Sequence, residues 1–581
     1  MHDLLIQGGT IVDGTGAERF VGDVAVTNGV ITNVGAPGTI GGPAKRVIDA
    51  DGHIVSPGWV DIHTHYDGQV TWDPDLAPSS VHGVTSIVMG NCGVGFAPAR
   101  PDRHDWLISL LEGVEDIPGT ALAEGKTWGW ESFPEYLDVL SGRNWTLDIG
   151  AQVPHAALRT FVMGEDGADN TIAANQQQIE EMSELCEASI RAGALGFTTS
   201  RTWVHRTSEG EQIGTLKAEA AEVLGIAEAL QRAGTGVVQL ISDAYQTTDE
   251  ELVASELELL EAIAMHVRRP LSFTVQQSDE SPGRFRDLLS AIARWREAGA
   301  DVSGQVAVRP LGVVAGLTST VNPLRCSATY RELASLPLVE RVAKMVQPEV
   351  RQKILAEHQA FEPSSFSAMM HSGYDRMYPM DRFPNYEPTP VDSLAGFAQR
   401  NGHGGNEEMY DFFTADGGRN LVYVPFMNYA GGNLDDVAEM IDSPVTLSGL
   451  SDAGAHCNTL SDGTMPTTAI SHWTRDREEG RRFTLEHMVH RQTQATASHV
   501  GWNDRGVVAP GYLADLNVFD HATINAEAPE LVADLPAGGT RLVQRSVGYA
   551  ATIKRGVVTA ENGELTGEHP GSLQRGAQTI A

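Results

Sequence analysis

Short apolar runs alternate with long amphipathic stretches through the middle of the chain. The stretches 176–192, 218–232 and 250–266 have the pattern of amphipathic helices. Apolar strands that alternate with helices are typical of a parallel sheet covered on both faces. The runs with the character of strands are residues 55–65, 85–92, 146–155, 194–200, 236–242, 271–277, 301–309 and 445–452. This α/β pattern predicts a (β/α)8 TIM barrel, in which the carboxyl ends of the strands carry the active site.

The first 55 residues have a different pattern, with short strands separated by turns. Asn28-Gly29 separates two strand-like runs and is a strong hairpin motif. A similar pattern of short strands and turns is present at the other end of the chain, in residues 514–520, 543–547 and 552–558. We therefore expect both termini to pair into one small β-sandwich. The predicted division assigns residues 1–55 and 506–581 to this sandwich and residues 56–505 to the barrel.

Two long segments interrupt the barrel pattern. Residues 99–144 follow the second predicted strand, and residues 310–443 precede the eighth. Long segments in compact domains are often lids or binding loops. Residues 369–380, within the second segment, are rich in Met and Tyr. They suit either a flexible lid over an apolar ligand or the ordinary packing of a cap subdomain.

The composition limits the kinds of molecule that the protein is expected to bind. The chain has 41 Lys+Arg against 76 Asp+Glu, a net charge of −35, which should repel nucleic acid and anionic lipid. Four scattered cysteines without CxxC spacing argue against a disulfide framework. No signal peptide or membrane-spanning run is evident. We expect a cytoplasmic protein with a small-molecule substrate and no nucleic-acid or membrane partner, either as a monomer or as a homo-oligomer.

The sharpest chemical feature is the sequence Asp61-Ile62-His63-Thr64-His65, which ends the first predicted barrel strand. Side chains two residues apart on a strand project to the same face, so His63 and His65 can reach one metal ion through neutral imidazole nitrogens. The alternative is a hydrogen-bonded histidine pair at a strand end.

Cys92 ends the second predicted strand, in Gly90-Asn91-Cys92-Gly93. A thiolate at this position would be a good zinc ligand, and coordination would lower the pKa of the thiol. A buried cysteine can also serve simply as a small hydrophobic residue.

Asp452 follows the eighth predicted strand, at a glycine-rich turn. A carboxylate there can bind a metal ion and accept a proton from a metal-bound water, which is the task of a general base. The alternative is the N-cap of a following helix.

Other polar residues lie at strand ends and could orient a substrate. His155 follows the third strand, Arg201 and His205 follow the fourth, and Arg309 ends the seventh. An arginine can grip a carboxylate with two hydrogen bonds, and either histidine could face an oxyanion. The alternatives are structural ion pairs for the arginines and supporting hydrogen bonds for the histidines.

These features together resemble the amidohydrolase superfamily. Within it, three motifs look like the N-acyl-D-amino-acid deacylase (D-aminoacylase) family. They are Gly90-Asn91-Cys92-Gly93, Gly193-Ala194-Leu195-Gly196-Phe197, and Asp504-Arg505-Gly506 with Pro510-Gly511-Tyr512-Leu513-Ala514-Asp515. The resemblance implies a distorted TIM barrel, zinc (Zn2+), and hydrolysis of the N-acyl amide bond of a D-amino acid. The metal positions of the family carry over to His63, His65, Cys92 and Asp452.

The chain departs from that family at two strand ends. Family members also place a metal-binding histidine at the ends of the fifth and sixth strands, whereas residues 237–243 and 273–279 contain none. Gln276 is the expected replacement on the sixth strand. On the fifth, the choice is open among Gln239, Leu240, Ile241 and Ser242. Because a glutamine amide is a poor zinc ligand compared with imidazole, we expect one divalent metal and a second site that is weak or absent.

Three hypotheses follow from the sequence. The first is a metal-dependent hydrolase of an N-acyl (D-)amino acid, or alternatively of another amide, a lactam or an ester, with Asp452 as the base. The second is an inactive barrel that serves as a binding protein, motivated by the missing histidines. The third keeps the enzyme but gives Gln276 and Gln239 the role of hydrogen-bond partners of the substrate.

Overall fold

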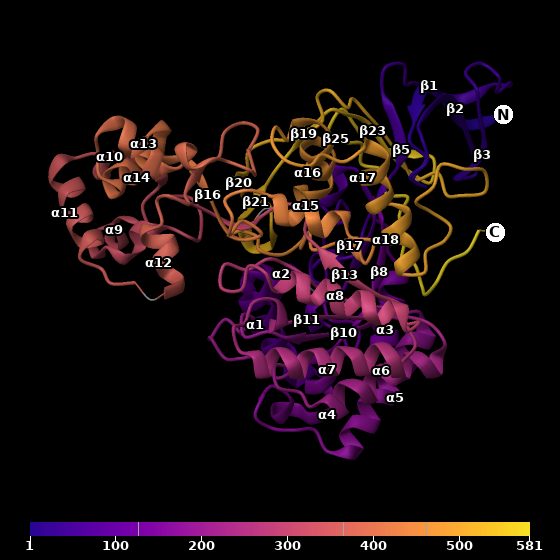
Figure 1. Cartoon of the computed structure of the whole chain (residues 1–581), viewed down its shortest axis with the longest axis horizontal. Coiled ribbons are helices and arrows are strands. Elements are labelled where there is room, and N and C mark those ends of the chain that lie inside the picture. Colours follow the sequence, from indigo (N-terminus) through magenta and orange to yellow (C-terminus); the bar gives the residue numbers. More distant parts are fainter. Residues whose placement is uncertain (126, 364, 461, 581) are drawn as a thin grey trace.

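The structure is a computed structural model that describes residues 1–125, 127–363, 365–460 and 462–580 (Figure 1). One sheet draws its strands from both ends of the chain, in the order β25-β24-β23-β18-β5-β1-β2-β3, with β4 paired to β1. Its strands are β1 (His2–Ile11), β2 (Phe20–Thr27), β3 (Val30–Gly35), β4 (Ala44–Asp49), β5 (Ile54–Pro57), β18 (Leu516–Phe519), β23 (Tyr549–Lys554), β24 (Val557–Glu561) and β25 (Glu564–Leu565). Strands β5 and β18 join the two ends in antiparallel register.

Each predicted barrel run contains a strand of a parallel ladder. One sheet has the order β6-β7-β8 and another has the order β17-β13-β12-β11-β10-β9. The strands are β6 (Trp59–Asp61), β7 (Val84–Met89), β8 (Asp148–Ala151), β9 (Val153–Pro154), β10 (Gly196–Arg201), β11 (Val237–Ser242), β12 (Leu271–Thr274), β13 (Val302–Val306) and β17 (Thr446–Ser448). The run 55–65 is not one strand, because its first part belongs to the sheet of the two termini.

The order of these strands is that expected of a barrel, but their hydrogen-bonded ladder does not close. Strands β8 and β9 are consecutive in the chain and are separated only by Gln152. At the other junction, a parallel bridge between Thr64 and Ala453 connects the segments that follow β6 and β17. The His65 amide also donates to the Ala453 carbonyl at 2.8 Å. These contacts bring His63, His65 and Asp452 to the same end of the strands.

Long helices cover the parallel strands, with α5, α6 and α7 lying side by side below them in Figure 1. Helix α5 begins with a capping box between Asn175 and Gln178 and ends at Gly193, whose φ of 116° favours glycine. The helices before the long insertion are α1 (His104–Glu115), α2 (Gly119–Gly125), α3 (Phe133–Ser141), α4 (His155–Met163), α5 (Gln176–Ala192), α6 (Ala220–Ala233), α7 (Glu250–His266) and α8 (Arg284–Glu297). Those after it are α15 (Asp435–Asp442), α16 (Met465–Ser471), α17 (Leu485–Arg491) and α18 (Gln494–His499).

The insertion before β17 extends to the left of the barrel helices in Figure 1. It contains α9 (Ala328–Leu333), α10 (Leu338–Met345), α11 (Pro348–Gln359), α12 (Ser365–Ser372), α13 (Leu394–Asn401) and α14 (Gly405–Thr414), with the antiparallel strands β14 (Leu311–Gly316), β15 (Tyr378–Pro379) and β16 (Leu421–Met427). It has a hydrophobic core of its own, in which Met377 is fully buried and against which Met369 and Met370 pack. The Met/Tyr-rich segment is therefore part of this core, as the cap-subdomain alternative predicts.

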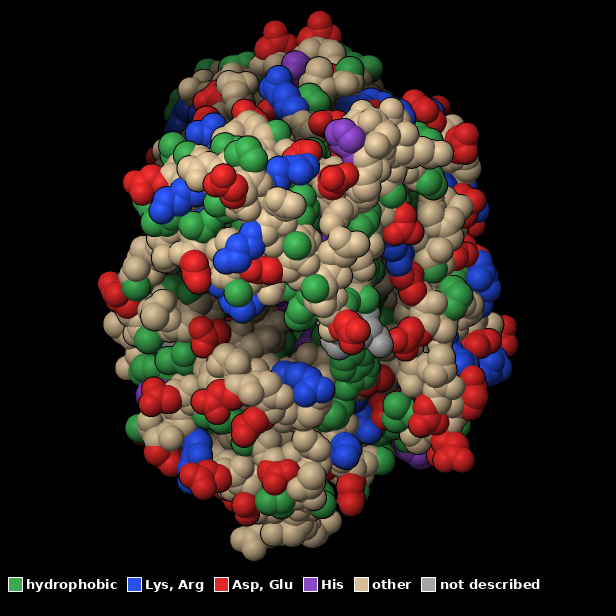
Figure 2. All heavy atoms as spheres, turned by 90° about the vertical axis from the view of Figure 1, so that its left-hand side faces the viewer, with side chains coloured by type: hydrophobic (Ala, Val, Ile, Leu, Met, Phe, Trp, Pro, Cys, Tyr) green, Lys and Arg blue, Asp and Glu red, His purple; other side chains and the backbone are tan. Residues whose placement is uncertain are grey.

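Acidic and basic side chains are interspersed over the face that carries the insertion (Figure 2). Among the helices of the described residues, none combines the length and the apolar character needed to cross a bilayer. The predicted domain limits at residues 55 and 505 remain predictions.

Candidate metal centre and active site

Four side chains predicted from the sequence converge where the strands end. His63 Nε2 lies 3.2 Å from Cys92 Sγ and 3.3 Å from Asp452 Oδ1. His65 Nε2 lies 3.4 Å from the same carboxylate oxygen. The donor atoms of His63, His65 and Cys92 are all within 4.8 Å of one another, and the three side chains are buried.

The geometry and the chemistry of these donors fit a zinc ion. Two ligands of a tetrahedral zinc ion lie about 3.3–3.6 Å apart when zinc–nitrogen and zinc–sulfur distances are about 2.0 and 2.3 Å. The separations at His63 and His65 are close to that range. Imidazole, thiolate and carboxylate are also the ligand types that zinc prefers.

The backbone at two of these residues adopts an uncommon conformation. Cys92 has a φ of 53° and Asp452 a φ of 48°, in the left-handed region that non-glycine residues seldom enter. Such conformations cluster at functional sites, where the surrounding structure enforces them. Here they turn each side chain back toward His63.

Glu115 is a neighbour that the sequence did not reveal. It is the last residue of α1, in the long segment after the second strand, and its carboxylate lies 3.1 Å from His65 Nδ1 in an ion-pair contact. His456 Nε2 lies 3.9 Å from the other oxygen of the same carboxylate. Burial raises the pKa of Glu115, while His65 and His456 oppose that rise.

Burial and charge set the protonation of the central groups. Burial lowers the pKa of His63 to about 4. At His65, burial acts in the same direction, but the charge of Glu115 and the bond to Asp452 raise the pKa well above its usual value. Burial would raise the pKa of Asp452, yet its contacts with His65 and His63 hold it well below the usual range. Asp452 is therefore a carboxylate at neutral pH, and burial raises the pKa of the Cys92 thiol to about 11.

The pocket around these groups is small, at about 60 Å³. Its lining is His63, His65, Cys92, Glu115, His205, Ile241, Tyr245, Thr274, Gln276, Leu311, Leu450, Asp452 and His456. Pockets for small molecules usually measure about 300–1,000 Å³. The pocket is therefore smaller in this structure than those that usually hold a small molecule.

The fifth and sixth strands supply no imidazole to this pocket. Ile241 lines it from β11 and Gln276 from the segment after β12. Gln239 points to a different place, where its Oε1 accepts a hydrogen bond from the Cys92 amide at 3.2 Å. Gln276 Oε1 accepts from Asn428 Nδ2, whereas Gln276 Nε2 has no hydrogen-bond partner among the described residues.

His205 is the other sequence-predicted substrate group that lines the pocket. Its Nδ1 lies 2.8 Å from Ser200 Oγ. Burial, followed by the charges of His65 and His456, lowers its pKa to about 3. The ring is therefore neutral, and when Ser200 donates to Nδ1 the ring proton is on Nε2.

The structure does not bring the other predicted substrate residues into the pocket. Arg201 forms a bidentate pair with Glu256 of α7, at 2.6–2.8 Å. Arg309 is buried, with its guanidinium 4.0 Å from the ring centroid of Tyr386. His155 is fully buried and lies 3.0 Å from Glu222 of α6.

No arginine or lysine of the described residues lines the pocket. In this structure Glu256 pairs with Arg201 and Tyr386 contacts Arg309, so their roles in binding substrate stay predictions. His155 contacts Thr199 of β10 at 2.8 Å and Glu222 of α6 at 3.0 Å, and its role in binding substrate stays a prediction.

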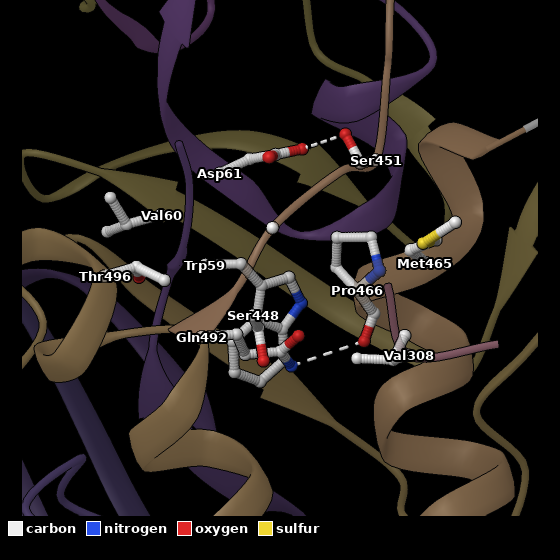
Figure 3. Close-up of a pocket in the computed structure, with 11 residues that line it drawn as sticks. Trp59, Val60, Asp61, Val308, Ser448, Ser451, Met465, Pro466, Gln492 and Thr496 are labelled. Atoms are coloured by element: carbon white, nitrogen blue, oxygen red, sulfur yellow. Dashed lines mark hydrogen bonds between the residues drawn. The ribbon is translucent and has the colours of Figure 1, made fainter. Parts of the chain in front are cut away.

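A separate cavity of about 30 Å³ lies on the amino-terminal side of the ligands along the first and eighth strands (Figure 3). At its edge Asp61 points toward Ser451 and accepts its hydroxyl hydrogen bond. Burial raises the pKa of Asp61 to about 7, against the effect of this bond. The contact ties together the chain segments that carry His63 and Asp452, so it supports the candidate site without being part of its pocket.

Several known proteins resemble this chain in sequence or in fold. The model of the amidohydrolase family matches residues 46–560. D-aminoacylase of Alcaligenes xylosoxydans xylosoxydans is 25% identical over 580 residues, which cover 98% of this chain and 97% of that protein. An uncharacterised protein of Mycobacterium tuberculosis is 32% identical over 200 residues, 34% of this chain and 32% of that protein. The chain thus matches about a third of the length of this mycobacterial relative.

Two solved structures cover the whole chain. A D-aminoacylase structure superposes with a TM-score of 0.64 at 23% identity, covering 100% of both chains, and shows that the fold is shared. The N-acyl-D-glutamate deacylase of Bordetella bronchiseptica, solved with zinc and a phosphonate mimic of the tetrahedral intermediate, gives a TM-score of 0.61. Its identity is 25%, with 99% of both chains covered.

Proposed function

Because this chain belongs to the amidohydrolase family and is D-aminoacylase-like, we propose that it is a zinc-dependent hydrolase of the amide bond of N-acyl-D-amino acids. The observation that carries the proposal is the convergence of His63, His65, Cys92 and Asp452 at one end of the parallel strands. The names of the full-length relatives support the D configuration and the small-molecule substrate.

His63, His65 and Asp452, with Cys92, would hold a single zinc ion. When bound there, zinc lowers the pKa of a water molecule and polarises the scissile carbonyl group. The absence of imidazole from residues 237–243 and 273–279 supports one ion rather than two.

Asp452 would move the proton. Its carboxylate is ionised at neutral pH, so one of its oxygens can accept a proton from the attacking water and later deliver it to the leaving nitrogen. The hydrogen bond from the Asp452 amide to the His63 carbonyl, at 3.2 Å, fixes the backbone that carries this side chain.

Two neutral donors in the pocket would bind the substrate. The Nε2–H of His205 can donate to the oxyanion that develops on the scissile carbonyl. The free N–H group of Gln276 can donate to the acyl oxygen or to the carboxylate of the substrate. Leu311, Leu450 and Tyr245 enclose the site and exclude bulk water.

The decisive experiment assays the zinc-loaded protein and Asp452→Asn on a panel of N-acyl D- and L-amino acids, extended to other amides, lactams and esters. We expect hydrolysis of N-acyl-D-amino acids, lost on chelation, and a fall of about 10²- to 10⁴-fold in Asp452→Asn when the two proteins are compared at equal zinc content. Asp138→Asn, an exposed pair with Arg575, is the control and should retain full turnover.

Near-normal turnover by Asp452→Asn would contradict its role as the base. If the zinc-loaded wild type hydrolysed no member of the panel, the enzyme proposal would fail, and a binding protein with the same barrel would be the better description.

A further inference from the structure

A second cluster of metal-ligating side chains lies in the insertion, outside the pocket described above. Cys326 ends a short 3-10 turn (Pro323–Cys326), His358 lies near the end of α11, and His371 lies near the end of α12. One donor atom of each residue lies within 4.8 Å of the other two. Three separate segments thus bring a thiol and two imidazoles to one point.

The two imidazoles are buried, and three of their four ring nitrogens have no hydrogen-bond partner among the described residues. His358 is 1% exposed and His371 is 8% exposed, and their rings stack with centroids 3.9 Å apart. Within the described residues, neither ring nitrogen of His358 has a hydrogen-bond partner, and neither does Nδ1 of His371. A buried polar group without a partner destabilises the folded chain, and such groups are rare in native proteins. Three of them at one point indicate a missing ligand.

His371 has one ring nitrogen that is engaged in a hydrogen bond and one that is available to a metal ion. Its Nε2–H donates to the His358 carbonyl at 3.1 Å, which leaves the lone pair of Nδ1 free. Metal-bound histidines commonly donate their other N–H group to a carbonyl or carboxylate, and this bond fixes the tautomer. The Cys326 thiol donates to the Pro323 carbonyl at 3.3 Å, and metal binding would replace that proton.

A neighbouring set of hydrogen bonds connects the backbone segments that carry Cys326 and His358. Glu357 Oε2 accepts from Ser327 Oγ at 2.7 Å and from the Thr329 amide at 2.9 Å. Since Glu357 precedes His358 and Ser327 follows Cys326, these bonds fix the two backbones beside the cluster. The backbone beside two of the three residues is therefore fixed, whereas the stacked rings of His358 and His371 must turn relative to each other for both lone pairs to face one ion.

We propose that Cys326, His358 and His371 bind a structural zinc ion, with a water molecule as the fourth ligand. One thiolate and two imidazoles suit zinc and exclude the oxygen-preferring cations magnesium and calcium. The ion would link the 3-10 turn to α11 and α12. Structural metals supply folding free energy to small units whose cores are limited. This site is independent of the proposed hydrolysis.

The first test measures zinc per chain by mass spectrometry in the full-length protein purified without chelators. We expect Cys326→Ser and His358→Ala each to hold one zinc equivalent less than the wild type. Cys186→Ser is the matched control, because Cys186 is fully buried in α5 and belongs to no such cluster. Its zinc content should equal that of the wild type.

The second test uses Co2+ as a spectroscopic probe in Cys92→Ser, which lacks the thiol of the first site. We expect a near-ultraviolet cobalt–thiolate absorption band that disappears in Cys92→Ser/Cys326→Ser. Equal zinc in the wild type and Cys326→Ser would overturn the proposal, and so would the absence of this band in Cys92→Ser. The cobalt–thiolate band tests the proposed site even if His358→Ala fails to fold, because it is measured in the cysteine variants.

Discussion

His63 Nδ1 donates a hydrogen bond to Gln305 Oε1 at 2.7 Å, and the opposite nitrogen of the same ring faces Cys92 and Asp452. Gln305 is itself held by a bond from its Nε2 to Ser272 Oγ at 2.9 Å. This chain of bonds fixes both the tautomer of His63 and the direction of its free lone pair. Partners of this kind raise the affinity of a metal site by orienting its ligands.

Gln305→Ala should weaken zinc binding about 10- to 100-fold, because His63 loses the acceptor that selects its tautomer. Competition with a chromogenic chelator measures the change. Gln492→Ala is the control, since Gln492 is also buried but donates to the Pro466 carbonyl and contacts none of the proposed ligands. An unchanged zinc affinity in folded Gln305→Ala would show that Gln305 does not position His63.

Glu115→Gln should also reduce zinc affinity about 10- to 100-fold, because the negative charge beside His65 is lost. The glutamine keeps the size of the side chain, so packing at the end of α1 is preserved. Glu112→Gln, on the exposed face of the same helix, should leave the affinity unchanged. Equal affinities for the two variants would exclude an electrostatic role for Glu115 at this site.

The sequence predicted the parts of the site that depend on strand periodicity. The two-residue spacing predicted that His63 and His65 face the same side, although both lie just beyond β6, which ends at Asp61. The position of Asp452 after an apolar run predicted that it lies at the same end of the strands. Both predictions rest on local pattern and on the fold class. The order of the barrel strands was predicted from the same pattern. The interruption at Gln152, which divides the third predicted strand into β8 and β9, was not predicted.

The remaining site residues depend on tertiary packing, which the sequence pattern does not encode. Glu115 reaches His65 only because α1 folds back over the strand ends, and nothing in its local sequence marks it. The sequence predicted that Arg201 could bind the substrate, but Glu256 on helix α7 forms an ion pair with it. The partner of a charged side chain depends on how distant elements pack. The sequence around Arg201 therefore could not show whether its guanidinium is free to bind a substrate.

Gln276→His should lose activity without gaining a second metal ion. Asn428 donates a hydrogen bond to the side-chain oxygen of Gln276, which leaves the amide N–H group of Gln276 to face the pocket. An imidazole at this position cannot both accept from Asn428 and donate to a substrate in the same way. Ile241 on the neighbouring strand supplies no second ligand. Zinc content and kcat/KM on the best substrate test this. A gain of one zinc equivalent together with higher activity would instead identify Gln276 as a degraded ligand.

Asp148→Asn should destabilise the fold by about 3–5 kcal/mol, because it removes the charge from a buried ion-pair network. Asp148 Oδ2 lies 2.6 Å from Lys554 Nζ and 2.8 Å from Arg505 Nη1, and all three side chains are fully buried. The network ties β8 to β23 of the terminal sheet. Asp138→Asn, at an exposed pair with Arg575, should change the stability by less than about 1 kcal/mol. Urea unfolding at neutral pH compares the two.

The same network predicts a dependence on pH. Burial alone would raise the pKa of Asp148, but Lys554 and Arg505 hold it far below its usual value. The unfolded chain therefore takes up a proton near pH 4, before the folded chain does. The stabilisation is fully present at neutral pH and is lost progressively as the pH falls below about 5, until the folded carboxyl is protonated as well. Wild-type stability should fall more steeply than that of Asp148→Asn over this range, so the difference between them should narrow. A constant difference would mean that the charge of Asp148 is not its source.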